Sequence, residues 1–124
     1  VIYPAAYSSC YAITGVNESG STCADCHDGS KVKFTIPMER NGNTSRNSLS
    51  LSLSNTTPSY IGGSSAATAT MAGIAALVWS VKPSLTRQQV YDILKNTSQY
   101  TSSTSSHGYG NPNASAAVAL ALTY

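Results

Sequence analysis

The chain has 124 residues, of which 41% are hydrophobic and 10% are charged, and its formal net charge is +2. This composition suits one hydrophobic core of ordinary size, and the lack of a basic stripe or an acidic tail argues against a nucleic-acid partner. The longest apolar segment, residues 72–78, is too short to span a bilayer, so we expect no membrane partner.

The chain starts without a signal-peptide pattern, so we expect a processed product or a cut piece of a longer protein. Serine, threonine and asparagine are abundant, lysine and glutamate are scarce, and there are three cysteines. An uncharged polar surface with cysteines is typical of proteins outside the cytoplasm. We therefore expect an extracytoplasmic or secreted location.

Strand signals dominate residues 1–60. β-Branched residues at 11–16 end in the turn-prone sequence NESG, and residues 32–36 alternate apolar and polar side chains up to a proline. Within residues 49–53 every second residue is a leucine and the others are serines. This alternation predicts a strand with one buried face.

Helical signals dominate residues 65–122. Apolar residues recur at helical spacing from 65 to 80, and the other faces of this segment also carry alanine, glycine or leucine. A helix that is apolar on nearly every face belongs in the centre of a core. Lys82 and Pro83 end this helix.

Two further helices follow. Thr86 predicts the N-cap of the second helix, with Gln89 as its capping-box partner, and we expect this helix to run to about Asn96. Asn111 is predicted to cap the third helix, with Pro112 at its first position. Strands followed by helices indicate an α/β or α+β layer architecture.

Two glycines and two serines stand directly before the first predicted helix, at residues 62–65. A serine in the first helical turn lies at the positive end of the helix dipole, where unpaired backbone N–H groups can bind an oxyanion. Glycines before it permit a tight turn and the close approach of a substrate backbone. The alternative is that Ser64 or Ser65 only caps the helix. The residues of this segment by themselves leave both interpretations open.

The sequence GSSAATATMAG at residues 63–73 resembles the nucleophile motif of subtilisin-like serine peptidases, G-T-S-x-A-[ST]-P-x-x-A-G. On this resemblance Ser65 takes the place of the nucleophile. The chain departs from the motif at Ser64, where the family has threonine, and at Ala69, where it has proline.

Other stretches resemble the same family in the same order: YPAAYSSCYAITGV at 3–16, KVKFTIP at 31–37, KPSLTRQQVYDILKNTS at 82–98 and GYGNPNASAAV at 108–118. The resemblance thus covers most of the chain. It implies an α/β fold, a three-layer sandwich with a mostly parallel sheet. Residues 1–124 would form a single partial domain, the C-terminal part of such a peptidase.

The resemblance also implies a reaction, the hydrolysis of peptide bonds through an acyl-enzyme. In this family the order along the chain is Asp, His, oxyanion-hole Asn and then the nucleophile, so the first three would precede Val1. The chain would contribute Ser65 as nucleophile, with the Ser65 backbone N–H in the oxyanion hole. Its implied partners are a polypeptide substrate and the missing N-terminal part of the domain. The isolated chain is expected to be inactive.

The two histidines of the chain do not fill the role of the base. Asp25 and His27 precede Ser65 in the right order, but they lie beside cysteines in a segment that the family does not use for catalysis. His107 stands in a polar loop with glycines, and we interpret it as a solvated surface histidine. A non-catalytic binding module that keeps the peptidase core is the alternative function.

The sequence CADCH at residues 23–27 matches the attachment pattern of c-type haem, with Met38 or Met71 as a second axial ligand. Zinc is another option, because four side chains are of the right type: Cys10, Cys23, Cys26 and His27. The favoured interpretation is one disulfide among the three cysteines and one free thiol, with no pairing readable from the sequence. We therefore predict neither a metal nor a cofactor.

Overall fold

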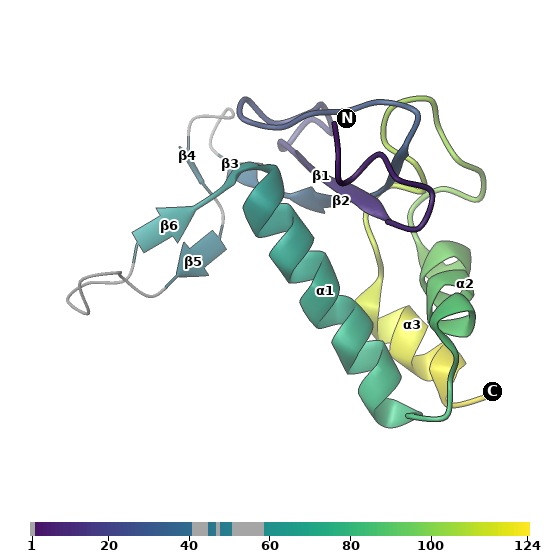
Figure 1. Cartoon of the computed structure of the whole chain (residues 1–124). Helices are drawn as coiled ribbons and strands as arrows, with labels where there is room; N and C mark the ends of the chain where they lie inside the picture. Colours follow the sequence, from purple (N-terminus) through teal and green to yellow (C-terminus); the bar gives the residue numbers. More distant parts are fainter. Residues whose placement is uncertain (1, 41–44, 47, 51–58) are drawn as a thin grey trace.

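The computed structural model describes residues 2–40, 45–46, 48–50 and 59–124. The described elements combine short strands with three helices (Figure 1). They are β1 (Ala12–Val16), β2 (Val32–Pro37), β3 (Glu39–Arg40), β4 (Ser45–Arg46), β5 (Ser48–Ser50), β6 (Ser59–Ile61), α1 (Gly63–Val81), α2 (Arg87–Thr97) and α3 (Ala114–Ala121).

Strands β1 and β2 form a parallel pair, in which Ile13 lies opposite Phe34 and Gly15 opposite Ile36. These four residues share one face of the pair, because successive side chains of a strand alternate between faces. Helix α1 packs against both strands, and Phe34 and Ile36 belong to the buried core. The predicted strands at 11–16 and 32–36 are confirmed within one residue at each end.

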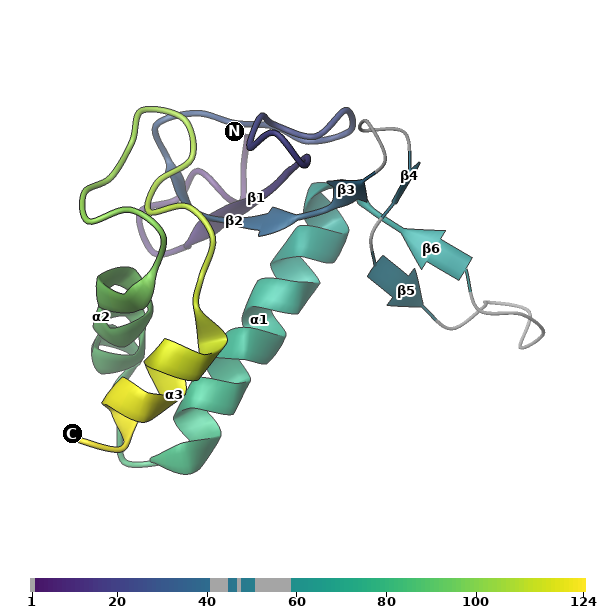
Figure 2. The ribbon, with the colours of Figure 1, turned by 180° about the vertical axis from the view of Figure 1, so that it is seen from behind.

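Two short antiparallel pairs, β3 with β4 and β5 with β6, follow the parallel pair. Both views show β5 and β6 on the side of the molecule away from α2 and α3 (Figures 1 and 2). The predicted strand at 49–53 is found in part, since β5 includes Leu49. Leu51 and Leu53 lie outside the described residues.

The three helices pack together beside the sheet, with α3 contacting both α1 and α2 (Figure 2). The predicted first helix is confirmed, with one or two more residues at each end. The prediction that this helix lies in the centre of the core is wrong for this chain. The buried residues of α1 are only Ala66, Ala67, Met71 and Val78. Nothing among the described elements covers the remaining apolar face, where Leu77 is 49% exposed.

Helix α1 is the single helix of the described residues that is long and apolar enough to cross a membrane, by length and composition alone. Core helices of globular domains meet the same criterion. In this structure α1 packs against β1, β2, α2 and α3. These contacts are those of a core helix with one side uncovered.

The second helix begins as predicted. Thr86 is the N-cap of α2, and its side chain and that of Gln89 form the reciprocal capping box. The start of the third helix was predicted wrongly, because Asn113 and not Asn111 caps α3, and Pro112 precedes the helix. Asn111 instead uses its side-chain oxygen to accept a hydrogen bond from Thr35 Oγ1 at 2.6 Å.

The segment after α2 runs beside β2, away from β1. The N–H of Tyr109 donates to the carbonyl of Lys33 at 2.8 Å, and the N–H of Thr35 donates to the carbonyl of Gly110 at 3.0 Å. This segment therefore extends the hydrogen bonding along the outer edge of β2. The parallel pair with helices packed on it confirms the α/β class that the sequence predicted.

Candidate active site

The chain turns sharply into α1 through two glycines. Gly62, the N-cap, is extended, with φ −157° and ψ −159°. Gly63 has φ +81°, in the left-handed region that favours glycine because a Cβ there would clash with the backbone. The glycine pair thus lets the helix start abruptly, with Ser64 and Ser65 in its first turn.

Neither serine caps the helix, so the capping interpretation of Ser64 and Ser65 is wrong: the N-cap is Gly62, and no side chain accepts a hydrogen bond there. The Ser64 carbonyl accepts a hydrogen bond from Thr68 Oγ1 at 2.8 Å, whereas the Ser65 side chain is exposed. The first turn carries no acidic residue. Its N–H groups and the positive end of the helix dipole are therefore not neutralised by a side chain.

Among the described residues, Ser65 has no hydrogen bond to a histidine. Asp25 and His27 are both exposed, in the turn that contains the cysteines. The structure therefore does not bring the two histidines and Ser65 together as a catalytic unit. Proton removal from Ser65 would need a base that the described residues do not place there.

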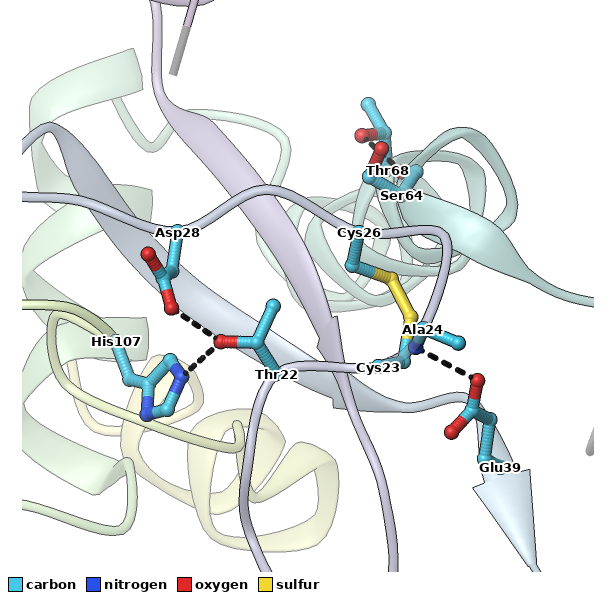
Figure 3. Close-up of a disulfide and its surroundings, with 9 residues drawn as sticks. All are labelled: Thr22, Cys23, Ala24, Cys26, Asp28, Glu39, Ser64, Thr68 and His107. Atoms are coloured by element: carbon cyan, nitrogen blue, oxygen red, sulfur yellow. Dashed lines mark hydrogen bonds between the residues drawn. A yellow bond between two sulfur atoms is a disulfide. The ribbon is translucent and has the colours of Figure 1, made fainter. Parts of the chain in front are cut away.

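His107 forms a cluster with Thr22 and Asp28 (Figure 3). Thr22 Oγ1 donates to Asp28 Oδ2 at 2.5 Å and lies 2.9 Å from His107 Nε2. Because the hydroxyl proton of Thr22 goes to Asp28, the Nε2–H of His107 must be the donor to Thr22. His107 is half-buried, so its interpretation as a solvated histidine was wrong. No sequence signal pointed to this cluster, since Thr22 and His107 are 85 positions apart.

The cysteines form one disulfide, Cys23–Cys26, and leave Cys10 free and exposed. This is the arrangement that the sequence analysis favoured, and the structure supplies the pairing. Oxidised sulfurs cannot act as the thiolates of a zinc site or as haem thioethers. Of the other suggested ligands, His27 is exposed, whereas Met38 and Met71 are buried in the apolar core.

An apolar cavity and a polar cavity lie beside the parallel pair, among the residues that the structure describes. An apolar cavity of about 340 Å³ lies between β1, α1 and α2, with Ile13, Met71 and Trp79 in its wall. A polar cavity of about 430 Å³ lies at the carboxyl ends of β1 and β2, with Glu18, Glu39 and His107 in its wall.

A cluster of aromatic residues stands beside the apolar cavity. Tyr91 of α2 stacks on Tyr11, with ring centroids 4.5 Å apart, and meets Phe34 edge-on at 5.9 Å. Burial raises the pKa of Tyr91, and Tyr109, Tyr11 and Asp92 nearby raise this pKa further. The Arg87 guanidinium lies over the Tyr11 ring at 4.8 Å. These contacts attach the segment before β1 to α2.

Comparison with known proteins identifies relatives of the chain. The protein-family model described as Subtilase family matches residues 1–111 of this chain. The chain is 33% identical over 110 residues to a thermostable alkaline protease of Halalkalibacterium halodurans, covering 89% of this chain and 28% of that protein. It is 33% identical over 115 residues to the subtilisin of Bacillus pumilus, covering 93% of this chain and 39% of that protein.

Solved structures agree with the sequence matches. A protease from Pseudoalteromonas arctica superposes with a TM-score of 0.74 at 25% identity, covering 96% of this chain and 38% of that chain. A lanthipeptide protease gives a TM-score of 0.78 at 20% identity, covering 95% of this chain and 43% of that chain. The chain therefore spans less than half the length of the proteins that it matches.

Proposed function

This chain belongs to the subtilase family, and we propose that it carries the nucleophile of a peptidase, with Ser65 attacking the carbonyl of a peptide bond to form an acyl-enzyme. The observation that carries the proposal is the position of Ser65. It is exposed in the first turn of a 19-residue helix, behind a left-handed glycine, with no partner for its hydroxyl among the described residues. This hydroxyl is free to take a base that lies outside the chain.

The same turn supports an oxyanion hole. The backbone N–H of Ser65 lies in the first helical turn, where N–H groups have no intrahelical acceptor. A negative charge that develops on the carbonyl oxygen would be stabilised by this N–H and by the helix dipole. The nucleophile and one oxyanion donor would thus come from the same residue.

The base, the acid that orients it and a second oxyanion donor would come from residues outside this chain. His107 is not placed to serve as the base, because it is hydrogen-bonded to Thr22 and has no hydrogen bond to Ser65 in the described part of the chain. His27 is exposed and has no hydrogen bond to Ser65 in the described part of the chain. We therefore infer that the 124 residues alone do not hydrolyse peptides.

The uncovered apolar surface is where the rest of the domain would dock. The apolar cavity is open between β1 and α1, and Leu77 and Trp79 of α1 are 49% and 39% exposed. In the described sheet, β2 is the one strand paired with β1. Further parallel strands on β1 would cover this surface, as burial of a helix that is apolar on all faces requires.

A location outside the cytoplasm is supported by the disulfide. Cys23 and Cys26 are oxidised, and disulfides persist mainly in oxidising compartments. The low content of charged residues, 10%, agrees with this location. The proposal is thus a secreted or otherwise extracytoplasmic peptidase acting on polypeptides.

The test uses the protein expressed with the residues that precede Val1. A fluorophosphonate should label it, and peptide mass mapping should place the label on Ser65. Ser65→Ala should lower kcat by about six orders of magnitude, the loss that removing a triad nucleophile causes in a subtilisin. The matched control Ser64→Ala should stay within about tenfold of the parent.

Labelling of another serine, or turnover unchanged in Ser65→Ala, would reject the assignment. A protein that folds with the preceding residues, yet neither takes the label nor cleaves a peptide, would be the non-catalytic binding module. The 124-residue chain measured alone is the negative control, since it should not turn over a peptide substrate.

A further inference from the structure

The Cys23–Cys26 disulfide lies on the α1 side of β1, against the strand backbone. A Cβ built on Gly15 would stand 2.9 Å from Cys23 Sγ, 2.8 Å from Cys26 Sγ and 2.6 Å from Met38 Cγ. The N–H of Cys23 donates to the Gly15 carbonyl at 3.0 Å. The two sulfurs therefore occupy the space that a side chain at position 15 would take.

The disulfide is also close to the start of α1. Cys23 belongs to the buried cluster that contains Ala66 and Ala67 of α1, and Cys26 packs against this cluster. Figure 3 shows Ser64 and Thr68 of the first two turns among the surroundings of the disulfide. The disulfide, a bond that can be broken chemically, thus lies near the start of the helix that holds Ser65.

The two sulfurs differ in access. Cys23 is only 3% exposed, whereas Cys26 is half-buried. Thiol–disulfide exchange requires a thiolate to approach one sulfur in line with the bond, so access selects the sulfur that is attacked. Cys26 is the more exposed residue, so we expect the attack at Cys26 Sγ, with Cys23 as the leaving group.

Reduction should leave the rest of the fold intact. The disulfide closes a ring between residues only three positions apart, and short rings restrict the unfolded chain less than long ones. After reduction the two sulfurs can no longer share the space beside Gly15. Cys26 is nearer to solvent and would move outward, withdrawing its support from the first turn of α1.

We propose that the Cys23–Cys26 disulfide is a thiol–disulfide exchange site for small dithiol reductants, and that its reduction loosens the first turn of α1. A thiolate of the dithiol attacks Cys26 Sγ, a mixed disulfide forms, and Cys23 leaves as a thiolate that takes up a proton. The second thiol of the reductant then attacks the mixed disulfide, forms its own internal disulfide and releases Cys26 as a thiol. Two electrons and two protons pass from the dithiol to the protein.

This proposal does not rest on the proposed function. The exchange and the loosening are measured without turnover. If the exchange experiment fails, the peptidase proposal is therefore unaffected. If the peptidase proposal fails, the exchange proposal is unaffected.

The exchange is tested on the 124-residue Cys10→Ser variant, which removes the exposed free thiol. Without denaturant, dithiothreitol followed by iodoacetamide should add two carbamidomethyl groups, and glutathione should form a mixed disulfide on Cys26. Adducts on Cys23 in preference to Cys26, or no reaction until denaturant is added, would overturn the proposal.

The loosening is tested by amide hydrogen exchange of the same variant before and after reduction. Exchange should accelerate by about tenfold or more in residues 67–69, whose N–H groups donate to the carbonyls of the first turn, while α2 changes by less than about twofold. The double variant Cys23→Ser/Cys26→Ser should match the reduced protein. Equal protection of residues 67–69 in both states, or loss of protection throughout α2, would overturn the proposal.

Discussion

The two sides of the β1–β2 pair differ in how they are held. Toward α1 the pair presents Ile13, Phe34 and Ile36, together with the disulfide stacked on Gly15. Toward the segment after α2 it presents Thr14 and Thr35, both buried. One side is fixed by apolar packing, and the other is fixed by hydrogen bonds.

This difference explains where reactive hydroxyls can occur. On the polar side Thr22 lies between Asp28 and His107, so its proton and its lone pair are both used. A catalytic triad instead places the imidazole between the carboxylate and the hydroxyl. The Thr22 cluster contains residue types of a triad but joins two loops, whereas the apolar side leaves Ser65 exposed.

The largest effect is expected on the polar side, at Gly108. This residue has φ +56°, and a Cβ would stand 2.3 Å from the Lys33 carbonyl oxygen and 2.5 Å from that of Val32. Backbone atoms cannot move aside cheaply, so Gly108→Ala should destabilise the chain by about 4 kcal/mol in urea unfolding.

Gly20→Ala is the matched control for Gly108→Ala. Its φ is +85°, but nothing lies within 4 Å of the added Cβ. Only the backbone strain remains, and the cost should be about 1 kcal/mol. Equal losses at both glycines would mean that the close approach of Gly108 to β2 is not what holds this side.

On the apolar side, Gly15→Ala would press a methyl group against Met38 and both sulfurs of the disulfide. Met38 is flexible and can move in part, so we expect a loss of about 2 kcal/mol, smaller than at Gly108. Gly73→Ala in α1 is the control, since nothing lies within 4 Å of its Cβ. It should gain up to about 1 kcal/mol from helix propensity. A neutral Gly15→Ala would show that the disulfide does not press on β1.

Substitutions at Thr14 and Thr35 distinguish the contribution of a hydrogen bond from that of burial, since both residues are buried. Thr35 Oγ1 donates to Asn111 Oδ1, whereas Thr14 Oγ1 is buried with no hydrogen-bond partner among the described residues. Thr35→Val should therefore cost about 1.5 kcal/mol, while Thr14→Val should be neutral or stabilising by about 1 kcal/mol. Chemical denaturation of the two variants decides this. A destabilised Thr14→Val protein would show that its hydroxyl does make a bond.

Local signals predicted the elements well. The β-branched residues of β1, the alternation in β2, the glycine pair before α1 and the Thr86 capping box each depend on a few neighbouring residues. The start of α3 was misplaced because Asn111 and Asn113 are equally plausible caps in sequence. The bond from Thr35, 76 positions away, engages Asn111 and leaves Asn113 as the cap.

Only those features of the candidate site that depend on neighbouring residues could be predicted from the sequence. The exposure of Ser65 follows from the glycine turn and the helix behind it. The cysteine pairing, the stacking of the disulfide on Gly15 and the bond from His107 to Thr22 depend on contacts between distant segments. No periodicity in the sequence encodes these contacts, so they could not be read in advance.

The smallest effect is expected from Tyr91, which tests whether the apolar side excludes charge. Burial raises the pKa of Tyr91 above its ordinary value of 10.0. The unfolded chain therefore releases this proton at lower pH than the folded chain, and the free energy of unfolding should fall as pH rises above about 10. Tyr91→Phe removes this contribution, so its unfolding free energy should fall less between about pH 8 and pH 11. Identical pH profiles for the two proteins would mean that the Tyr91 hydroxyl is as well solvated in the fold as in the unfolded chain.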